Sequence, residues 1–323
     1  MGKRVLVTGG AGFLGSHLVE QLILRGDEVV AVDNCATGNW KNLAHLGAHP
    51  RLTRVDADVS KSIPVEVPVE QIFHFASPAS PKDFVPLGLE IMDVNSNGLR
   101  NCLEIAVQCG ATVVFASTSE VYGDPLVSPQ PETYWGNVNP NGIRSVYDES
   151  KRFGEALMMA YRRRHGVNTR ILRFFNTFGP RMRHDDGRVV PNFIIQALRN
   201  EPITIYGSGD QTRSFGYCLD SIRGAIALAD SDVIDPVNIG AEFEMSIRSF
   251  AELVIDLTGS SSEIIRLPAV PDDPQQRCPD LTRARKLLGY SPQTTLEHGL
   301  YATIEHFRST FNQTVQTATG THG

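Results

Sequence analysis

A tyrosine and a lysine four residues apart, Tyr147 and Lys151, have the types and the spacing of an acid–base pair. They open a helical pattern, in which residues i and i+4 lie on one face. An ammonium group beside a phenol favours the phenolate, so we expect Lys151 to lower the tyrosine pKa and make Tyr147 a usable base near neutral pH. An isolated pair with this spacing is usually a surface tyrosine and a solvated lysine. The rest of the chain decides between these two interpretations.

Four polar residues follow the nearest predicted strand and extend this chemistry. Residues 112–116 are apolar and β-branched, as in a buried strand, and directly after them come Ser117, Thr118, Ser119 and Glu120. In an open α/β sheet, ligands bind at the carboxyl ends of the strands. We therefore expect these side chains to lie where the chemistry takes place.

A glycine-rich turn near the start of the chain predicts a dinucleotide site. Gly9, Gly12 and Gly15 connect a short apolar strand to a helical pattern. Such a turn brings backbone N–H groups and a helix N-terminus to a pyrophosphate. A second strand, residues 29–32, ends in Asp33, whose carboxylate can accept hydrogen bonds from the adenosine ribose and would repel a 2′-phosphate. This pattern favours NAD over NADP.

Strands alternate with helical segments along the first half of the chain. Asp58 follows a third strand, where it can meet the adenine amino group, and a fourth strand carries His74, which we interpret as a core residue. The alternation predicts an α/β fold with a Rossmann-type, doubly wound parallel sheet and right-handed crossovers. After residue 174 the alternation loosens, which predicts a smaller α/β substrate-binding lobe.

Composition and charge exclude several other classes of protein. The net charge of −6 and a pI near 5.9 argue against general binding of nucleic acid or anionic membranes. The five cysteines form no CxxC pair and the histidines no cluster, so we expect no metal site. No apolar run approaches a membrane span, and Lys3 and Arg4 precede a strand rather than a signal segment. A cytoplasmic location is the default expectation.

Together these motifs resemble the extended short-chain dehydrogenase/reductase family of nucleotide-sugar enzymes. The glycine turn, Asp33, Asp58 and the Tyr147–Lys151 pair carry this likeness. Within the family, the chain is similar to the UDP-glucuronate decarboxylases, which are also called UDP-xylose synthases. The similarity runs from about Lys3 to Phe307, and its most specific segments are residues 77–81, 117–125, 134–140, 175–182, 186–190, 206–209 and 273–277.

The resemblance implies decarboxylation of UDP-glucuronate to UDP-xylose through a 4-keto intermediate, with NAD as the cofactor and the hydride returned. It implies catalytic roles for Thr118, Ser119, Glu120, Tyr147, Lys151 and Arg277, and substrate contacts from Asn176, Arg188, Tyr206, Arg213 and Arg277. The implied cofactor-binding residues are Gly9, Gly12, Phe13, Leu14, Gly15, Asp33, Asn34, Thr37, Gly38, Asp58, Val59, Phe75, Ser77, Ala116, Tyr147, Lys151, Thr177 and Arg188.

The resemblance also divides the chain and predicts its assembly. We expect residues 1–174 to form the NAD-binding domain, with 214–240 returning to it. Residues 175–213 and 241–311 would form the nucleotide-sugar lobe, and 312–323 a flexible tail. We expect a homodimer, because apolar helix residues exceed what one sheet face needs. These residues are Cys102, Leu103, Val107, Phe153, Leu157 and Met158.

Other reactions of the same fold are the main alternatives. Sugar-nucleotide 4,6-dehydratases carry an aspartic acid after the threonine, where this chain has Ser119. A serine is a poor general acid, which disfavours loss of water from carbon 6, but it can lie beside a carboxylate without repelling it. A 4-epimerase or a 4,6-dehydratase remains the alternative. A non-catalytic NAD-sensing protein is a remote one, because such a protein would be expected to lack Tyr147 or Lys151.

One position departs from the family pattern. Asp93 stands where the family often has a lysine. A carboxylate near an anionic substrate would weaken binding, so the substrate contacts around Asp93 are expected to differ from those of the family.

Overall fold

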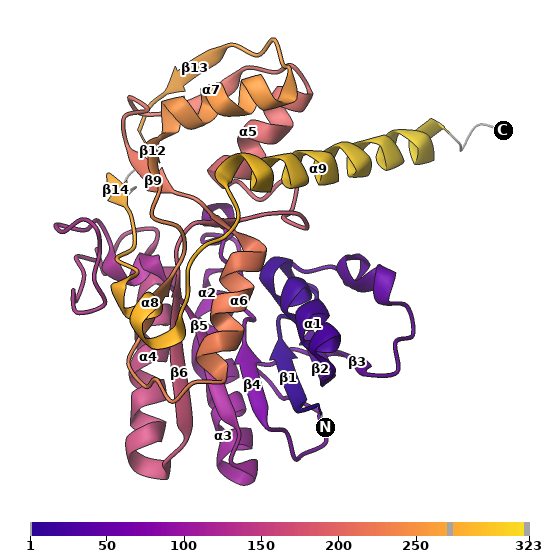
Figure 1. The fold of residues 1–323 in the computed structure, drawn as a ribbon, viewed down its shortest axis with the longest axis vertical. Helices are drawn as coiled ribbons and strands as arrows, with labels where there is room; N and C mark the ends of the chain where they lie inside the picture. The colour runs from indigo at the N-terminus through magenta and orange to yellow at the C-terminus, as the bar shows by residue number, and fades with distance from the viewer. Residues whose placement is uncertain (1, 270–273, 320–323) are drawn as a thin grey trace.

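A seven-stranded parallel sheet forms the centre of the larger of two lobes in the computed structural model (Figure 1). The structure describes residues 2–269 and 274–319, with side chains to residue 310. Every neighbouring pair of strands is parallel. The strand order reverses between β1 and β4, which creates a crevice at their carboxyl ends. The order is β11 (Val237–Ile239), β6 (Asn168–Phe174), β5 (Thr112–Thr118), β4 (Gln71–His74), β1 (Arg4–Thr8), β2 (Glu28–Asp33) and β3 (Leu52–Asp56).

Both faces of the sheet are buried beneath helices, and the residues of β1 show why. Val5 and Val7 pack on one face with α1 (Phe13–Arg25), α6 (Cys218–Ala229) and α8 (Thr282–Leu288). Leu6 packs on the opposite face with α3 (Leu99–Cys109) and α4 (Ser145–His165). Successive side chains of a strand point to opposite faces, so a strand covered on both sides must be apolar throughout. The predicted α/β Rossmann fold is confirmed.

The helix that precedes β5 has three parts. It begins as α2 (Gly88–Asp93), continues as a π-helical turn, η3 (Val94–Gly98), and ends as α3. His74 in β4 lies against this helix and is fully buried. Its ring nitrogens contact the hydroxyl of Thr8 at 2.8 Å and the carbonyl of Val94 at 3.0 Å. Burial lowers the pKa of His74 to about 3, as for a neutral core histidine.

The smaller lobe has its own apolar core, with Phe193, Phe250 and Phe307 near its centre. The side chain of Ser246 accepts a hydrogen bond from the Ser249 N–H at 3.0 Å and so caps the start of α7. The elements of the lobe are α5 (Val189–Leu198), β8 (Ile203–Tyr206), β9 (Thr212–Ser214), β12 (Glu244–Ser246), α7 (Ile247–Thr258), β13 (Ile264–Leu267), β14 (Gln276–Arg277) and α9 (Leu296–Thr319). A short parallel pair, β7 (Thr177–Phe178) and β10 (Gly216–Tyr217), adjoins it.

The structure refines the expected division of the chain. In the structure, α6 packs on the sheet of the larger lobe and β11 pairs with its strand β6. The chain then returns a second time, which the sequence did not predict: Leu281, Ala284 and Tyr290 lie in the sheet core rather than in the smaller lobe. Helix α9 runs on to Thr319, so residues 312–319 of the expected tail are helical, and 320–323 lie outside the described residues.

The helix residues expected to form a dimer interface fall into two groups. Cys102, Leu103 and Met158 are fully buried, and Leu157 nearly so, because all four pack in the chain's own core. The prediction that they offer surface to a second copy is wrong. Val107 and Phe153, by contrast, are 41% and 47% exposed, and Leu89 and Met92 on α2 are exposed as well. In the part of the chain that the structure describes, no helix combines the length and apolar character needed to cross a membrane.

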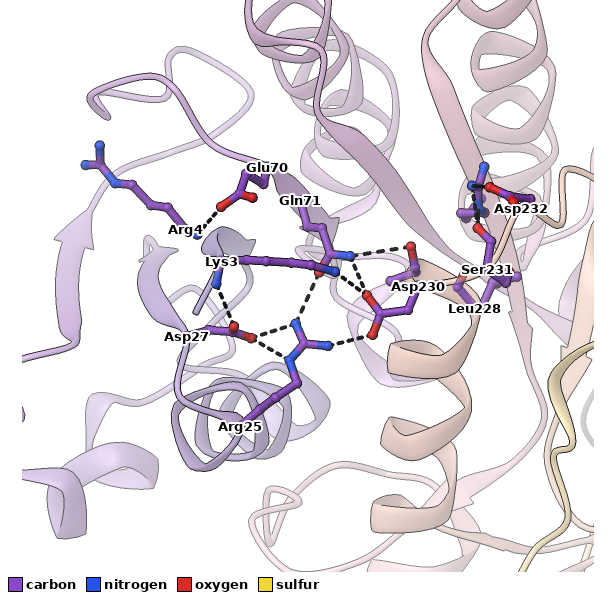
Figure 2. A network of polar contacts seen from close by, with 12 residues as sticks. Lys3, Arg4, Arg25, Asp27, Glu70, Gln71, Leu228, Asp230, Ser231 and Asp232 are labelled. Carbon is purple, nitrogen blue, oxygen red and sulfur yellow. Dashed lines mark hydrogen bonds and ion pairs between the residues drawn. The ribbon is translucent and has the colours of Figure 1, made fainter. Parts of the chain in front are cut away.

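A network of charges joins the elements at the amino end of the sheet (Figure 2). Asp27 accepts hydrogen bonds from the Lys3 N–H at 2.9 Å and from Arg25 Nε at 2.6 Å. Asp230, just after α6, accepts from Lys3 Nζ at 2.5 Å, Arg25 Nη1 at 2.8 Å and Gln71 Nε2 at 2.8 Å. The network ties the start of β1, the end of α1, the start of β4 and the end of α6 together.

Candidate active site

A cavity of about 1430 Å³ extends along the carboxyl ends of the strands and is lined by residues of both lobes. Every residue that the sequence assigned to catalysis, cofactor or substrate lines this cavity. The fold therefore brings the predicted site residues, which are spread along the sequence from Gly9 to Arg277, together at the edge of the sheet where an open α/β fold binds its ligands.

The glycine turn fits closely against the sheet and leaves room on its cavity side. Gly9 has φ +72°, and a Cβ there would lie 2.7 Å from the Ala76 nitrogen; a Cβ on Gly15 would lie 1.9 Å from the Gly9 carbonyl oxygen. A Cβ on Gly12 would meet only that carbonyl, at 3.1 Å. Gly12 precedes α1 without a side-chain cap, so the first N–H groups of α1 are available to an anion. A pyrophosphate fits this turn.

Asp33 lies at the end of β2, beside the glycine turn. Its carboxylate accepts hydrogen bonds from the N–H groups of Ala11 at 3.0 Å and Cys35 at 2.8 Å. Burial raises the pKa of Asp33, and these hydrogen bonds oppose the shift. A Cβ on Gly38 would lie 3.0 Å from Asp33 Oδ2, so the glycine keeps the approach to the carboxylate open. An acid held here suits ribose hydroxyls and would repel a 2′-phosphate.

Tyr147 and Lys151 reach the cavity because α4 packs very close to β5. A Cβ on Gly154 would lie 2.4 Å from the Phe115 ring, so only glycine permits this approach. Lys151 is 2% exposed, and its Nζ donates a hydrogen bond to the Ala116 carbonyl at 2.8 Å. Tyr147 stacks on Phe84, with ring centroids 5.3 Å apart. These contacts fix the start of α4 relative to the end of β5.

The expected effect of Lys151 on Tyr147 is wrong for this structure. Burial raises the pKa of Tyr147, although a hydrogen bond with Thr118 opposes the shift. Burial lowers the pKa of Lys151 to about 7. Lys151 Nζ lies 5.6 Å from the centre of the Tyr147 ring. The helical spacing predicted that both side chains share a face, but it carried no information on how strongly both are desolvated.

Glu120, in the 3-10 turn η4 (Ser119–Tyr122), is clamped between two arginines. Its Oε1 lies 3.0 Å from Arg277 Nη1, and its Oε2 lies 2.5 Å from Arg144 Nη2. Burial disfavours the charged form of Glu120, but Arg277 and Arg144 outweigh it and lower the pKa of Glu120 to about 2. Glu120 is therefore an anion at neutral pH, and its proton is not available to the chemistry.

Arg277 is the most deeply buried cation of the cavity, at 1% exposed. It donates from Nη1 to Ser119 Oγ at 3.0 Å and from Nη2 to the Gly123 carbonyl at 2.9 Å, while its Nε has no hydrogen-bond partner. Arg213 also acts on Glu120 through its charge. Three guanidinium groups around one carboxylate leave this end of the cavity positively charged, as an anionic ligand group requires.

The remaining expected substrate residues differ in their availability. Arg188 donates two hydrogen bonds to Asp186, with Nε–Oδ1 at 2.5 Å and Nη2–Oδ2 at 2.8 Å. A ligand can therefore bind Arg188 only beside this carboxylate or in its place. Asn176 has a buried amide nitrogen without a hydrogen-bond partner. Tyr206 is 46% exposed at the cavity rim. Asp93 is exposed and also lines the rim.

A buried polar network behind β5 supports the strand end and η4. Arg173 donates to both oxygens of Glu155, at 2.8 and 2.6 Å, and to the hydroxyl of Tyr122 at 2.9 Å. Ser117 donates to the same glutamate at 2.6 Å. Glu155 lies on α4 at the i+4 position from Lys151, so this contact locks the helix to β5. Tyr122 is in η4, so Arg173 also holds the turn that carries Glu120.

The sequence missed several side chains of the site. Phe84 stacks on Tyr147, Arg144 holds Glu120, and Asp186 holds Arg188. Asp148 is buried beside the arginine clamp. Two of these had a sequence signal, since Arg144 and Asp148 flank Tyr147 within one helical turn. The signal does not say which side chain turns inward.

Comparisons with known proteins agree with this geometry. The model of the NAD dependent epimerase/dehydratase family matches residues 5–240. UDP-glucuronic acid decarboxylase 1 from Xenopus tropicalis is 49% identical over 306 residues, which are 95% of this chain and 72% of that protein. Two solved structures are similar in fold. UDP-glucuronic acid 4-epimerase from Bacillus cereus, in complex with UDP-glucuronic acid and NAD, has a TM-score of 0.84 and 29% identity, covering 95% of this chain and 99% of that one. The dTDP-glucose 4,6-dehydratase DesIV from Streptomyces venezuelae, with NAD bound, has a TM-score of 0.85 and 30% identity, covering 95% and 97%.

Proposed function

The chain belongs to the NAD dependent epimerase/dehydratase family, and from this we infer that it is an enzyme that decarboxylates UDP-glucuronate to UDP-xylose with NAD as its cofactor. The relative from Xenopus tropicalis, with its much higher identity than the epimerase or the dehydratase, supports this reaction within the family.

The observation that carries the proposal is the positive charge beside Thr118 and Tyr147. Arg277, Arg144 and Arg213 act on the single carboxylate of Glu120. The excess of positive charge suits a sugar that bears a carboxylate of its own. Ser119 accepts a hydrogen bond from Arg277, and a serine hydroxyl is a poor general acid for a leaving hydroxyl. Both features favour decarboxylation over the loss of water.

In the proposed reaction each residue of the site has its own role. NAD, which the glycine turn, Asp33 and Lys151 would hold, would supply reversible hydride transfer at carbon 4 of the sugar. Burial raises the pKa of Tyr147, so this residue must first lose its own proton to solvent; as a phenolate beside Lys151 it then takes the proton from the 4-hydroxyl. The sugar is now a β-keto acid, which loses carbon dioxide readily because the electron pair enters an enolate. Thr118 and the protonated Tyr147 donate to the enolate oxygen, a stabilisation of roughly 2.7–4 kcal/mol per donor.

The positions of the cofactor residues fit this division. Gly12 and the start of α1 would hold the pyrophosphate, Asp33 the adenosine ribose, and Lys151 the nicotinamide ribose. Arg277 and Ser119 would orient the substrate carboxylate, and Asn176 and Arg213 the diphosphate.

We also propose a cytoplasmic homodimer, which goes beyond the UDP-sugar site itself. The exposed apolar residues Leu89, Met92, Val107 and Phe153 lie on α2, α3 and α4. A pair of these helices from each copy would bury them in a four-helix contact. Light scattering should give the mass of a dimer at micromolar concentration, and a monomer would refute the proposed contact.

One assay tests the reaction. The purified protein is incubated with NAD and, in separate tubes, UDP-glucuronate, UDP-glucose and dTDP-glucose, and the products are identified by mass. We expect loss of carbon dioxide from UDP-glucuronate alone. Inversion at carbon 4 with the carboxylate retained would identify an epimerase, and loss of water from a glucose nucleotide would identify a dehydratase.

A further inference from the structure

A second, smaller cavity of about 270 Å³ adjoins the main one at the Glu120 clamp. The two cavities share Glu120, Arg144 and Pro274. The outer wall of the smaller cavity contains Asn137 and Asn139, both exposed to solvent. The cavity is polar, and its volume corresponds to several water molecules at about 30 Å³ each. It therefore connects the clamp with bulk solvent.

Asp148 lines this smaller cavity from the first turn of α4. It is 5% exposed, and its Oδ1 has no hydrogen-bond partner. The charged groups that act on it are Glu120 from η4, Arg277 from β14, Arg144 before α4, and Glu149 on its own helix. Burial, together with the negative charge of Glu120, raises the pKa of Asp148 to about 8, and the two arginines oppose the shift. Asp148 is a carboxylic acid at neutral pH, unlike its neighbour Glu120.

The proposed reaction needs one proton that the side chains described so far do not supply. After carbon dioxide leaves, carbon 5 must be protonated before the hydride can return. Glu120 is held ionised by its arginines, so it has no proton to give. Tyr147 carries the proton taken from the 4-hydroxyl and must return it to that oxygen. The donor for carbon 5 is therefore neither Glu120 nor Tyr147.

We propose that Asp148 supplies the proton for carbon 5, through water in the smaller cavity; this inference rests on the proposed decarboxylation. The bond between carbons 5 and 6 breaks and its electron pair enters the enolate. That pair then forms the new C5–H bond with the relayed proton, and Asp148 is left as a carboxylate. Asp148 regains a proton from solvent past Asn137 and Asn139. No oxidant or reductant is needed in this step.

The inference predicts a pH dependence with a definite sign. The protonated form of Asp148 is the active one, so turnover falls as pH rises through about 8. The test compares Asp148→Asn, which keeps the shape but has no acidic proton, with Glu149→Gln. Glu149 is the matched control because it is the next acid on the helix and faces Arg152 at 3.5 Å instead of the cavity. Asp148→Glu, which restores an acid, is the rescue variant.

In Asp148→Asn we expect a fall in kcat of roughly tenfold or more. NADH absorbance should rise in the steady state because the hydride waits for carbon 5, and the alkaline limb near pH 8 should disappear. Glu149→Gln should keep the wild-type kcat and the alkaline limb, with the limb moved slightly to lower pH because the charge of Glu149 raises the pKa of Asp148. Asp148→Glu should recover part of the rate. An unchanged kcat and pH limb in Asp148→Asn would overturn the inference. A pH profile of wild-type kcat without an alkaline limb near pH 8 would also overturn it, and this measurement does not depend on the folding of any variant. If wild-type protein leaves the carboxylate of UDP-glucuronate in place, the proposed function fails instead, whatever Asp148 does.

Discussion

Two clusters of charged side chains lie at opposite ends of the same parallel sheet, and they are built differently. At the amino end, Lys3, Arg25, Asp27 and Asp230 pair with one another and with Gln71 (Figure 2). At the carboxyl end, the charges of three arginines act on Glu120, and two of these arginines also act on Asp148. The first cluster balances its charges, whereas the second leaves a positive excess facing a cavity.

Solvent exposure separates the two clusters further. Lys3 and Asp230 are 39% and 38% exposed, so their attraction is screened. Arg277 and Lys151 are 1% and 2% exposed. There, burial moves the pKa of Lys151 down and that of Asp148 up, and both changes favour the neutral form. Residues of the same types therefore serve to join elements at one end, and are held in reactive protonation states at the other.

The largest effect on stability is expected from Arg277→Met. It leaves the buried Glu120 carboxylate with less compensation, which should lower the free energy of unfolding by about 3–5 kcal/mol and reduce turnover. Urea unfolding gives the difference. The same change at Arg285, whose pair with Glu242 is half exposed, is the control and should cost less than about 1 kcal/mol. A loss at Arg277 as small as at Arg285 would contradict the contrast between the clusters.

Tyr147→Phe should lower kcat by roughly two or more decades, because it removes the base. The ring can still stack on Phe84, so the melting temperature and NAD affinity should stay near wild type. Tyr301→Phe, at an exposed site on α9, is the matched control and should leave kcat unchanged. Near-normal turnover in Tyr147→Phe would remove this residue from the mechanism.

Lys151→Met should abolish efficient turnover yet stabilise the protein without cofactor. The pKa of Lys151 falls from 10.5 to about 7 on folding, which costs about 5 kcal/mol at low pH, and the lost hydrogen bond to Ala116 offsets part of this gain. A net gain of about 2 kcal/mol is expected below pH 7. Wild-type stability rises with pH between about 7 and 10.5, because the folded state binds fewer protons there, so the gain should shrink.

Urea unfolding from pH 6 to pH 9 measures this gain for Lys151→Met. Lys286→Met, at an exposed position on α8, should show no such trend. A gain that does not depend on pH would show that Lys151 is not desolvated in the folded protein.

Asp230→Asn should have the smallest effect. The aspartate has several partners, and their positive charges and hydrogen bonds outweigh burial and lower its pKa, but the pair with Lys3 is partly exposed. We expect a loss of about 0–1 kcal/mol and unchanged turnover. A loss of more than about 2 kcal/mol in the free energy of unfolding, or a change in kcat, would show that the amino-end cluster does more than join neighbouring elements.

Much of the fold and the location of the site could be predicted from the sequence, because their signals are local. The glycine turn, Asp33 and the alternation of strands and helices gave the Rossmann sheet, and the apolar strand before Ser117 gave the cavity edge. The prediction that His74 is a core residue is confirmed as well. Each of these depends on residues close together in the chain or on the regular period of an element.

The parts that could not be predicted depend on long-range contacts. The bond from Arg277 to Ser119 joins residues 158 positions apart. The return of Leu281 and Tyr290 to the sheet follows a segment with no helical or strand pattern of its own. The raised pKa of Tyr147 and that of Asp148 depend on burial by several elements at once. No periodicity records such burial.

The most direct test of the account is an isotope experiment on the proposed reaction. UDP-glucuronate with deuterium at carbon 4 is converted in ordinary water, and unlabelled UDP-glucuronate is converted in heavy water; both products are examined by mass and NMR. We expect UDP-xylose that retains the deuterium at carbon 4 in the first case and gains one solvent deuterium at carbon 5 in the second. Release of a 4-keto pentose with stoichiometric NADH, or inversion at carbon 4 with the carboxylate retained, would contradict it.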